Sequence, residues 1–216
     1  SRGLGDVYKR QVTWFLTGME KHSDEAREEL LGNIDNFIGS MAHHMSNMLT
    51  PSLQVAMNEL SNHDHSRFLT RTNHKVGRVA NLGYEAASQD INVAVMREAV
   101  VMQMTWPGAP TLYYGDEAGL CGFTDPDNRR TYPWGREKRD LINFYREMIQ
   151  IHRKSLALRK GSIKMLKAEP DLLAYGRFWG NEQIVVIINN SDHLKEVRVP
   201  VWHCLLYTSP SPRDTR

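Results

Sequence analysis

Three consecutive polar residues, Asn62, His63 and Asp64, have the types needed to bind a sugar. They directly follow residues 53–60, a short and largely apolar run that reads as a buried strand. In α/β barrels the active site is built at the carboxyl ends of the strands, so polar residues at such a position are suggestive. A carboxylate beside an imidazole suits vicinal sugar hydroxyls, because Asp64 can accept hydrogen bonds and His63 can donate one. Alone, however, an Asn-His-Asp tripeptide is more often a capped loop.

The elements expected to position these residues alternate between helix and strand. A second short buried strand is predicted over residues 111–114, after the chain break at the Pro-rich segment 106–110. Apolar residues spaced three and four apart predict helices, with Ser23 or Asp24 in the N-cap position of the first. The predicted helices cover residues 24–48, 88–103 and 138–156. This alternation is typical of a parallel sheet, either doubly wound or closed into a barrel.

Beyond Gly161 the pattern changes to short strand-like runs separated by turn residues. These runs predict an antiparallel β segment after the helix-rich part of the chain. The predicted strands are residues 162–168, 172–178, 183–189 and 195–201.

Two further segments, read together with the tripeptide, indicate a family resemblance. Residues 106–117 read WPGAPTLYYGDE, and residues 125–134 read DPDNRRTYPW. With Asn-His-Asp before them, in this order and spacing, they resemble the last third of the catalytic domain of the α-amylase family of glycoside hydrolases. In that family the seventh barrel strand ends in Asn-His-Asp, and the eighth carries Pro-Gly-x-Pro-x-x-Tyr-Tyr-Gly-Asp-Glu. The match runs from about Val12 to Trp202, and the 125–134 loop looks like the neopullulanase, cyclomaltodextrinase and maltogenic amylase branch.

This resemblance implies roles for individual residues. Asp64 matches the catalytic carboxylate that stabilises the transition state by binding sugar hydroxyls. His63 matches the histidine that hydrogen-bonds the same sugar, and Asn62 belongs to the same substrate-binding motif. Asp125 and Arg129, four residues apart, match a loop pair that grips the next glucose.

Neighbouring residues are expected to be structural. Asp116 and Glu117 belong to a family motif but are predicted to brace the mouth of the barrel. Tyr113 and Tyr114 could stack on sugar rings, yet a place in the core is the favoured prediction. Arg67 and Arg71, after Asp64, are expected to pair with nearby acids rather than to bind substrate.

The resemblance also implies the fold: the C-terminal part of a TIM (β/α)8 barrel, about strands six to eight, followed by a truncated antiparallel β-sandwich domain. The barrel part is expected over residues 12–160 and the β domain over residues 161–203, with Val12–Gly18 near strand six. Retaining glycosidases need a nucleophile and an acid/base. The family carries these after strands four and five, upstream of Val12, so this chain alone is expected to be an inactive fragment.

The two ends of the chain are predicted not to belong to the domain. Residues 1–11 (SRGLGDVYKRQ) and 204–216 (CLLYTSPSPRDTR) can be back-translated to one inverted DNA element. That element resembles a transposase-type sequencing adapter, and such segments are excluded from fold reasoning.

Composition then excludes several classes of function. The chain has 27 basic and 25 acidic side chains, and removing the two ends leaves 22 against 23, so nucleic-acid binding is not indicated. No apolar run approaches the roughly 20 residues of a membrane helix. Without the ends Cys121 stands alone, which favours a reducing compartment and, with the branch resemblance, a cytoplasmic location.

Three functions remain open at this point. The favoured one is that the parent protein is a retaining hydrolase of α-1,4 and possibly α-1,6 glucosidic bonds, acting on an α-glucan oligosaccharide such as maltodextrin, cyclodextrin or pullulan. The alternatives are a non-catalytic carbohydrate-binding relative and a metal-dependent barrel hydrolase. His63 and His65 do not suffice for a metal site, because no Cys or spaced carboxylate set accompanies them. We therefore expect no cofactor, although calcium and a homodimer are compatible with the parent enzyme.

Overall fold

A computed structural model describes residues 4–200, with side chains from residue 8 onward. It contains eight α-helices, three 3-10 helices and five strands in this described range. In chain order these are α1 (Leu4–Thr17), η1 (Glu28–Leu30), α2 (Ile34–Ser46), α3 (Thr50–Gln54), β1 (Met57–Glu59), α4 (Phe68–Arg71), α5 (Val79–Leu82), η2 (Glu85–Ser88), α6 (Val93–Thr105), β2 (Ala109–Thr111), η3 (Asp127–Arg129), α7 (Arg139–Lys154), α8 (Leu156–Lys160), β3 (Ser162–Glu169), β4 (Leu172–Trp179) and β5 (Glu182–Asn189).

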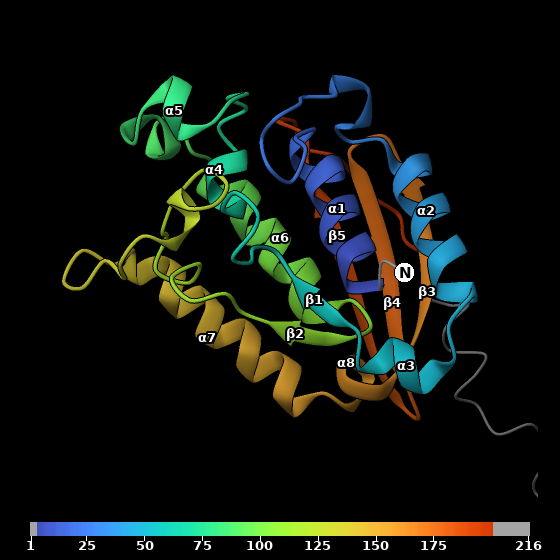
Figure 1. The fold of residues 1–216 in the computed structure, drawn as a ribbon. Coiled ribbons are helices and arrows are strands. Elements are labelled where there is room, and N and C mark those ends of the chain that lie inside the picture. Colours follow the sequence, from blue (N-terminus) through green and yellow to red (C-terminus); the bar gives the residue numbers. More distant parts are fainter. Residues whose placement is uncertain (1–3, 201–216) are drawn as a thin grey trace, which may run out of the picture.

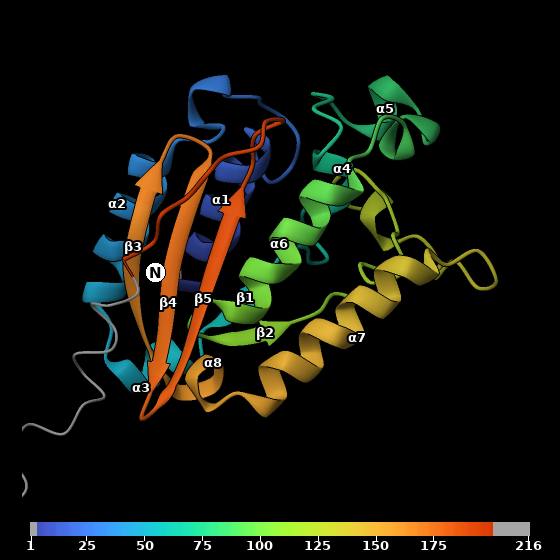
Figure 2. The same cartoon turned by 180° about the vertical axis from the view of Figure 1, so that it is seen from behind.

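The strands form two separate sheets. β1 and β2 are parallel, with Met57 opposite Ala109 and Glu59 opposite Thr111. The other sheet is antiparallel in the order β3-β4-β5. Helices α1 and α2 cover one face of this antiparallel sheet, while α6 packs on the two-stranded sheet and α7 packs on α6 (Figures 1 and 2).

Polar side chains tie the two short parallel strands to α6. Gln103 Nε2 donates to the carbonyls of Asn58 (3.1 Å) and Thr111 (2.8 Å). Asn58 Nδ2 in turn donates to the carbonyls of Trp106 and Pro107. These bonds satisfy buried peptide groups that such a short ladder leaves over, because a buried polar group without a partner is costly.

One hydrophobic core joins the helices to the antiparallel sheet. Its aromatic rings meet in series: Phe15 to Phe37 at 5.2 Å, Phe37 to Trp106 at 5.4 Å and Trp106 to Tyr175 at 5.1 Å between centroids. The Tyr175 hydroxyl also bonds Thr105 Oγ1 at 2.6 Å. The β3-β4-β5 sheet therefore shares its core with α1, α2 and α6 rather than forming one of its own.

The first predicted helix begins later than its apolar pattern suggests. The only helix within residues 24–33 is the short η1, and α2 begins after Asn33, whose side chain accepts a bond from the Asn36 amide at 3.0 Å. The prediction of an N-cap at Ser23 or Asp24 was wrong. Gly32 has φ +64°, a conformation outside the helical region that separates η1 from α2.

The predicted buried strands are also shorter than expected. Residues 50–54 form α3, with Pro51 in its first turn, so β1 is confined to Met57–Glu59. The second strand, β2, spans Ala109–Thr111 and ends where residues 111–114 were expected to pair. The helices expected over residues 88–103 and 138–156 are α6 and α7, with shifted ends.

Two further expectations on strands were wrong. Val12–Gly18 was placed near strand six, but residues 12–17 are helical in α1, so the described residues hold two parallel strands rather than three. Of the predicted strand 195–201, residues 195–200 carry no strand, and residue 201 lies outside the described residues. The three preceding strands are present as β3, β4 and β5.

Candidate functional site

Because β1 and β2 are parallel, the segments that follow them leave the sheet at the same edge. Asn62, His63 and Asp64 follow β1, and the long segment 112–138 follows β2. The candidate site is built from these two segments.

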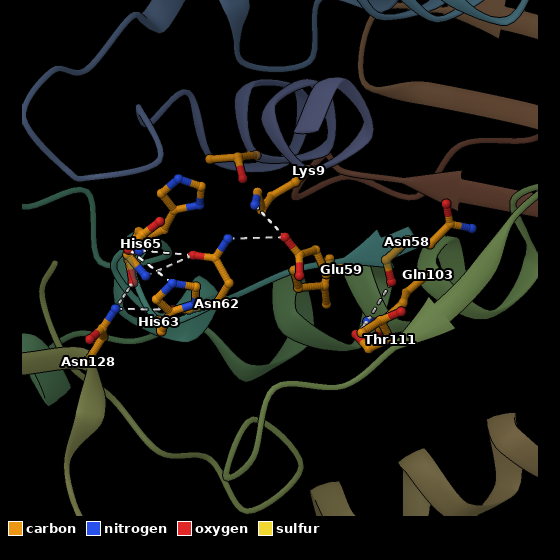
Figure 3. Close-up of polar contacts among 12 residues, drawn as sticks. Lys9, Asn58, Glu59, Asn62, His63, His65, Gln103, Thr111 and Asn128 are labelled. Atoms are coloured by element: carbon orange, nitrogen blue, oxygen red, sulfur yellow. Dashed lines mark hydrogen bonds and ion pairs between the residues drawn. The ribbon is translucent and has the colours of Figure 1, made fainter. Parts of the chain in front are cut away.

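Asn62 shapes the first segment. Its Oδ1 accepts hydrogen bonds from the backbone amides of Asp64 (3.0 Å) and His65 (3.1 Å), which is the geometry of an Asx turn. Its Nδ2 donates to Glu59 Oε1 at 3.1 Å (Figure 3). The side chain that was predicted to bind substrate is half-buried and hydrogen-bonded to the protein through both its oxygen and its nitrogen.

Side chains of the second segment donate hydrogen bonds to backbone carbonyls of the first. Asn128 Nδ2 donates to the carbonyls of Asn62 (3.1 Å) and His65 (2.7 Å) (Figure 3). Thr124 Oγ1 donates to the carbonyl of Asp64 at 2.6 Å. These bonds bring the 124–129 segment directly against the Asn-His-Asp turn.

A close approach of backbone permits this arrangement. A Cβ on Gly122 would lie 2.5 Å from the carbonyl oxygen of Asp127 and 2.8 Å from the Asn128 Cα, so only glycine fits there. The Gly122 amide donates to Thr70 Oγ1, and its carbonyl accepts from the Arg67 amide. Gly122 therefore allows the segment 112–138 to pack closely against the residues that follow β1.

The buried side chain of Arg67 also links the two segments. Its guanidinium pairs with Asp116 at 2.9 Å and donates to the carbonyls of Asn128 (2.9 Å) and Tyr114 (2.5 Å). It also lies over the rings of Tyr113 and Tyr114, 4.0 and 4.7 Å from their centroids. Burial raises the pKa of Asp116, and the adjacent Arg67 acts in the opposite direction. The expected pairing with an acid is confirmed for Arg67, whereas Arg71 donates to Thr13 Oγ1 and to the Leu60 carbonyl instead.

The tyrosines do not lie in the core as predicted. Tyr114 is 43% exposed and Tyr113 is half-buried. Both rings lie against the same cation, the buried guanidinium of Arg67.

The side chains left facing solvent are those with sugar-binding chemistry. His63 and Asp64 are 69% and 61% exposed, with His63 Nε2 3.3 Å from Asp64 Oδ1. Asp125 and Arg129 form an ion pair and are about half exposed. The amide of Asp125 lies 3.5 Å from the Asp64 carbonyl, so the two predicted pairs are neighbours on one surface.

His65 belongs to the framework. It is buried, and its ring meets that of His22 edge-on at 4.8 Å. Burial, together with the nearby charges of Lys9 and Arg71, lowers its pKa to about 2, so this imidazole is neutral at physiological pH.

Sequence reasoning missed Glu59, Thr124 and Asn128, which position the site. A charged residue inside the apolar 53–60 run was a signal for Glu59. The acceptors of Thr124 and Asn128 are backbone carbonyls, which leave no trace in the sequence.

The described residues offer neither a metal-ion site nor a membrane-spanning helix. They contain no group of three or more His, Cys, Asp or Glu side chains placed to hold a metal ion. Within the same range, no helix is both long and apolar enough to cross a membrane.

Comparison with known proteins identifies the class to which this fold and site belong. The family model described as "Alpha amylase, catalytic domain" matches residues 15–160. The chain therefore belongs to the α-amylase family, and the β3-β4-β5 sheet follows the matched region directly.

The curated relatives are enzymes named for α-glucan substrates. An amylopullulanase of Thermoanaerobacter thermohydrosulfuricus is 35% identical over 69% of this chain and 11% of its own length. A cyclomaltodextrinase of Thermoanaerobacter pseudethanolicus is 36% identical over 64% of this chain and 22% of its own. Neopullulanase 2 of Thermoactinomyces vulgaris is 33% identical over 90% of this chain and 29% of its own. This confirms the predicted family resemblance, and the chain spans less than a third of each of these relatives.

Solved structures agree on the fold. A cyclomaltodextrinase superposes with a TM-score of 0.68 and 26% identity, covering 85% of this chain and 27% of that one. The debranching enzyme of Nostoc punctiforme gives a TM-score of 0.70 at 24% identity, covering 85% and 36%. These likenesses imply the TIM-barrel-type fold of the family with a C-terminal sheet, of which the described residues contribute two parallel strands and the β3-β4-β5 sheet.

Proposed function

We propose that this chain carries the sugar-gripping part of a retaining α-glucan hydrolase, with Asp64 as its transition-state-stabilising carboxylate. The observation that carries the proposal is the contrast within one loop. Asn62 is bound on both sides by protein, whereas His63 and Asp64 next to it are exposed and adjacent to each other. A rigid turn presenting an acceptor and a donor to solvent matches what neighbouring sugar hydroxyls require.

The role proposed for each side chain follows from the positive charge that develops on the sugar ring in the transition state. Cleavage of a glucosidic bond passes through an oxocarbenium-like transition state with positive charge on the ring. The Asp64 carboxylate stabilises that state by accepting hydrogen bonds from ring hydroxyls, and His63 donates to the same sugar. Asp125 and Arg129 grip the next glucose, because their segment is bonded directly to the Asp64 turn.

The bond-breaking groups are proposed to lie outside the described residues. A retaining mechanism needs a nucleophile and an acid/base about 5–5.5 Å apart. Here Asp116 is buried in its pair with Arg67, and Asp125 is paired with Arg129. We infer that the chain alone does not hydrolyse α-glucans. We also infer that the whole protein takes maltodextrin, cyclodextrin or pullulan, and that β3-β4-β5 belongs to its C-terminal β-sandwich.

Calorimetric titration of the chain tests this proposal. Maltotriose and β-cyclodextrin should bind, cellotriose should not, and none of the three should be hydrolysed by the chain alone. Asp64→Asn should weaken maltotriose binding about tenfold, the loss of one charge-assisted hydrogen bond. Asp140→Asn, which alters an exposed carboxylate on α7, is the matched control. Equal affinity of wild type and Asp64→Asn would contradict the assignment.

A further inference from the structure

The carboxylate of Glu59, on β1, is bonded to Lys9 and to Asn62, and among the described residues it makes no hydrogen bond or ion pair with His63 or Asp64. We propose that Glu59 is a positioning residue: it orients the Asn62 side-chain amide, and that amide fixes the backbone of Asp64 and His65. The proposal rests on the function proposed above, since Asp64 is the group being positioned.

The placement of Glu59 on β1 follows from strand geometry. Successive side chains of a strand point to opposite faces. Asn58 is directed to the α6–β2 connection, where it bonds two backbone carbonyls, so Glu59 points to the other face of the strand. There its side chain is 15% exposed, and Oε1 receives two donors, Asn62 Nδ2 at 3.1 Å and Lys9 Nζ at 2.5 Å (Figure 3).

The contact with Glu59 affects the loop through the orientation of the Asn62 side-chain amide. A primary amide has one end that donates and one that accepts, and a rotation of 180° exchanges them. An ionised carboxylate only accepts, so Glu59 admits the NH2 end of Asn62 and turns Oδ1 toward the loop. Oδ1 then accepts from the amides of Asp64 and His65. In the opposite orientation the NH2 group would face those two N–H donors, and the Asx turn would be lost.

Lys9 lies in the segment 1–11 that was predicted not to belong to the domain, but in the structure this part of α1 packs into the core and the Lys9 side chain is only 3% exposed. Its role can be separated from that of Asn62. It pairs with the Glu59 carboxylate, whereas the Asx turn is made by Asn62. Loss of the Lys9 charge therefore removes an ion-pair partner of Glu59 and leaves the acceptor for Asn62 in place. Loss of the Glu59 acceptor removes what orients Asn62.

The test uses the full 216-residue chain, with amide hydrogen exchange of Asp64 and His65 measured by NMR alongside maltotriose affinity. Glu59→Leu should speed the exchange of both amides at least tenfold and weaken maltotriose binding about tenfold. Glu59→Gln retains an acceptor oxygen and should stay within threefold of wild type in both measurements, as should Lys9→Met. Unchanged exchange in Glu59→Leu, or equal losses in Glu59→Leu and Glu59→Gln, would overturn the proposal.

A swapped pair covers the case in which Glu59→Leu does not fold. Asn62→Asp keeps an acceptor for the two amides but places a second carboxylate against Glu59, so exchange should accelerate. Adding Glu59→Gln supplies an NH2 donor to that new carboxylate and should restore slow exchange. Absence of this rescue would also overturn the proposal. If wild type fails to bind maltotriose, the proposed function fails, while the exchange rates still decide the role of Glu59.

Discussion

Two of the buried arginines stabilise different regions of this molecule in different ways. Arg67, in the candidate site, is paired with the buried carboxylate of Asp116. Arg177, on β4 where the antiparallel sheet meets α6, donates instead to the backbone carbonyls of Thr105, Leu158, Gly161 and Ser162. No carboxylate pairs with it in the part of the chain that the structure describes, and burial lowers its pKa to about 10.

The difference separates a region that supports a site from a region that supports only the fold. The Arg67–Asp116 pair is internally neutral, so it anchors two loops while His63 and Asp64 remain exposed above it. The donors of Arg177 are used on carbonyls at the C-terminal end of α6, within α8 and in the connection from α8 to β3, so its charge stabilises the junction of these elements. A cation satisfied only by backbone dipoles should therefore matter for stability and be silent in sugar binding.

Removing Arg177 should have the largest effect on stability. Arg177→Met keeps apolar volume but leaves several buried carbonyls without a donor, which should cost about 4 kcal/mol of unfolding free energy. Urea unfolding measures this, with Arg159→Met as a control at an exposed position. A loss below about 1 kcal/mol would show that water replaces the guanidinium at the junction.

Asp116→Asn should cost somewhat less but also affect the site. It leaves the Arg67 charge buried without its partner, a change expected to destabilise the chain by about 3 kcal/mol. Because Arg67 also holds the backbone of Asn128 and Tyr114, maltotriose affinity should fall as well. Stability loss with unchanged affinity would break the proposed link between the ion pair and the loops.

Glu98 on α6 offers the converse case, a carboxylate without a guanidinium. Its Oε2 is buried and has no hydrogen-bond partner among the described residues, and burial raises its pKa from 4.5 to about 7. The folded state then binds more protons than the unfolded state between these values, so stability falls as pH rises from 4.5 to 7. Glu98→Gln should stabilise the chain at pH 8 by about 1 kcal/mol, allowing for solvent screening of this half-buried group.

The comparison of unfolding free energies at pH 5 and pH 8 is the measurement for Glu98→Gln. Its advantage over wild type should be small at pH 5 and larger at pH 8. Glu147→Gln, on α7, serves as a control at an exposed position. An equal gain at both pH values would mean that the carboxyl group does not titrate in this window.

Sequence patterns predicted the parts of this molecule that depend on side-chain type. The alternation of helices with buried runs indicated parallel strands, and the polar tripeptide after the first of them indicated the candidate site. What escaped prediction depends on backbone. The late start of α2 follows from Gly32 and the Asn33 cap, and the role of Arg177 follows from carbonyl acceptors that any sequence could supply.

The contacts of Tyr114 explain why the prediction of a core position for it was wrong. Its apolar surroundings in the sequence favoured a core position, yet its ring packs on Arg67 and its hydroxyl donates to the carbonyl of Arg130 at 2.9 Å. Neither partner is close to it in the sequence, so periodicity carried no information about them.

The central claim is that the turn after β1 and the 124–129 segment together form an α-glucan site. Mapping of maltotriose-induced changes in the amide NMR spectrum of the chain tests it most directly. We predict shifts concentrated at His63, Asp64, Asp125 and Arg129, with the amides around Arg177 unchanged, and loss of those shifts in Asp64→Asn. Shifts confined to other surfaces, or an unaltered pattern in Asp64→Asn, would contradict the account.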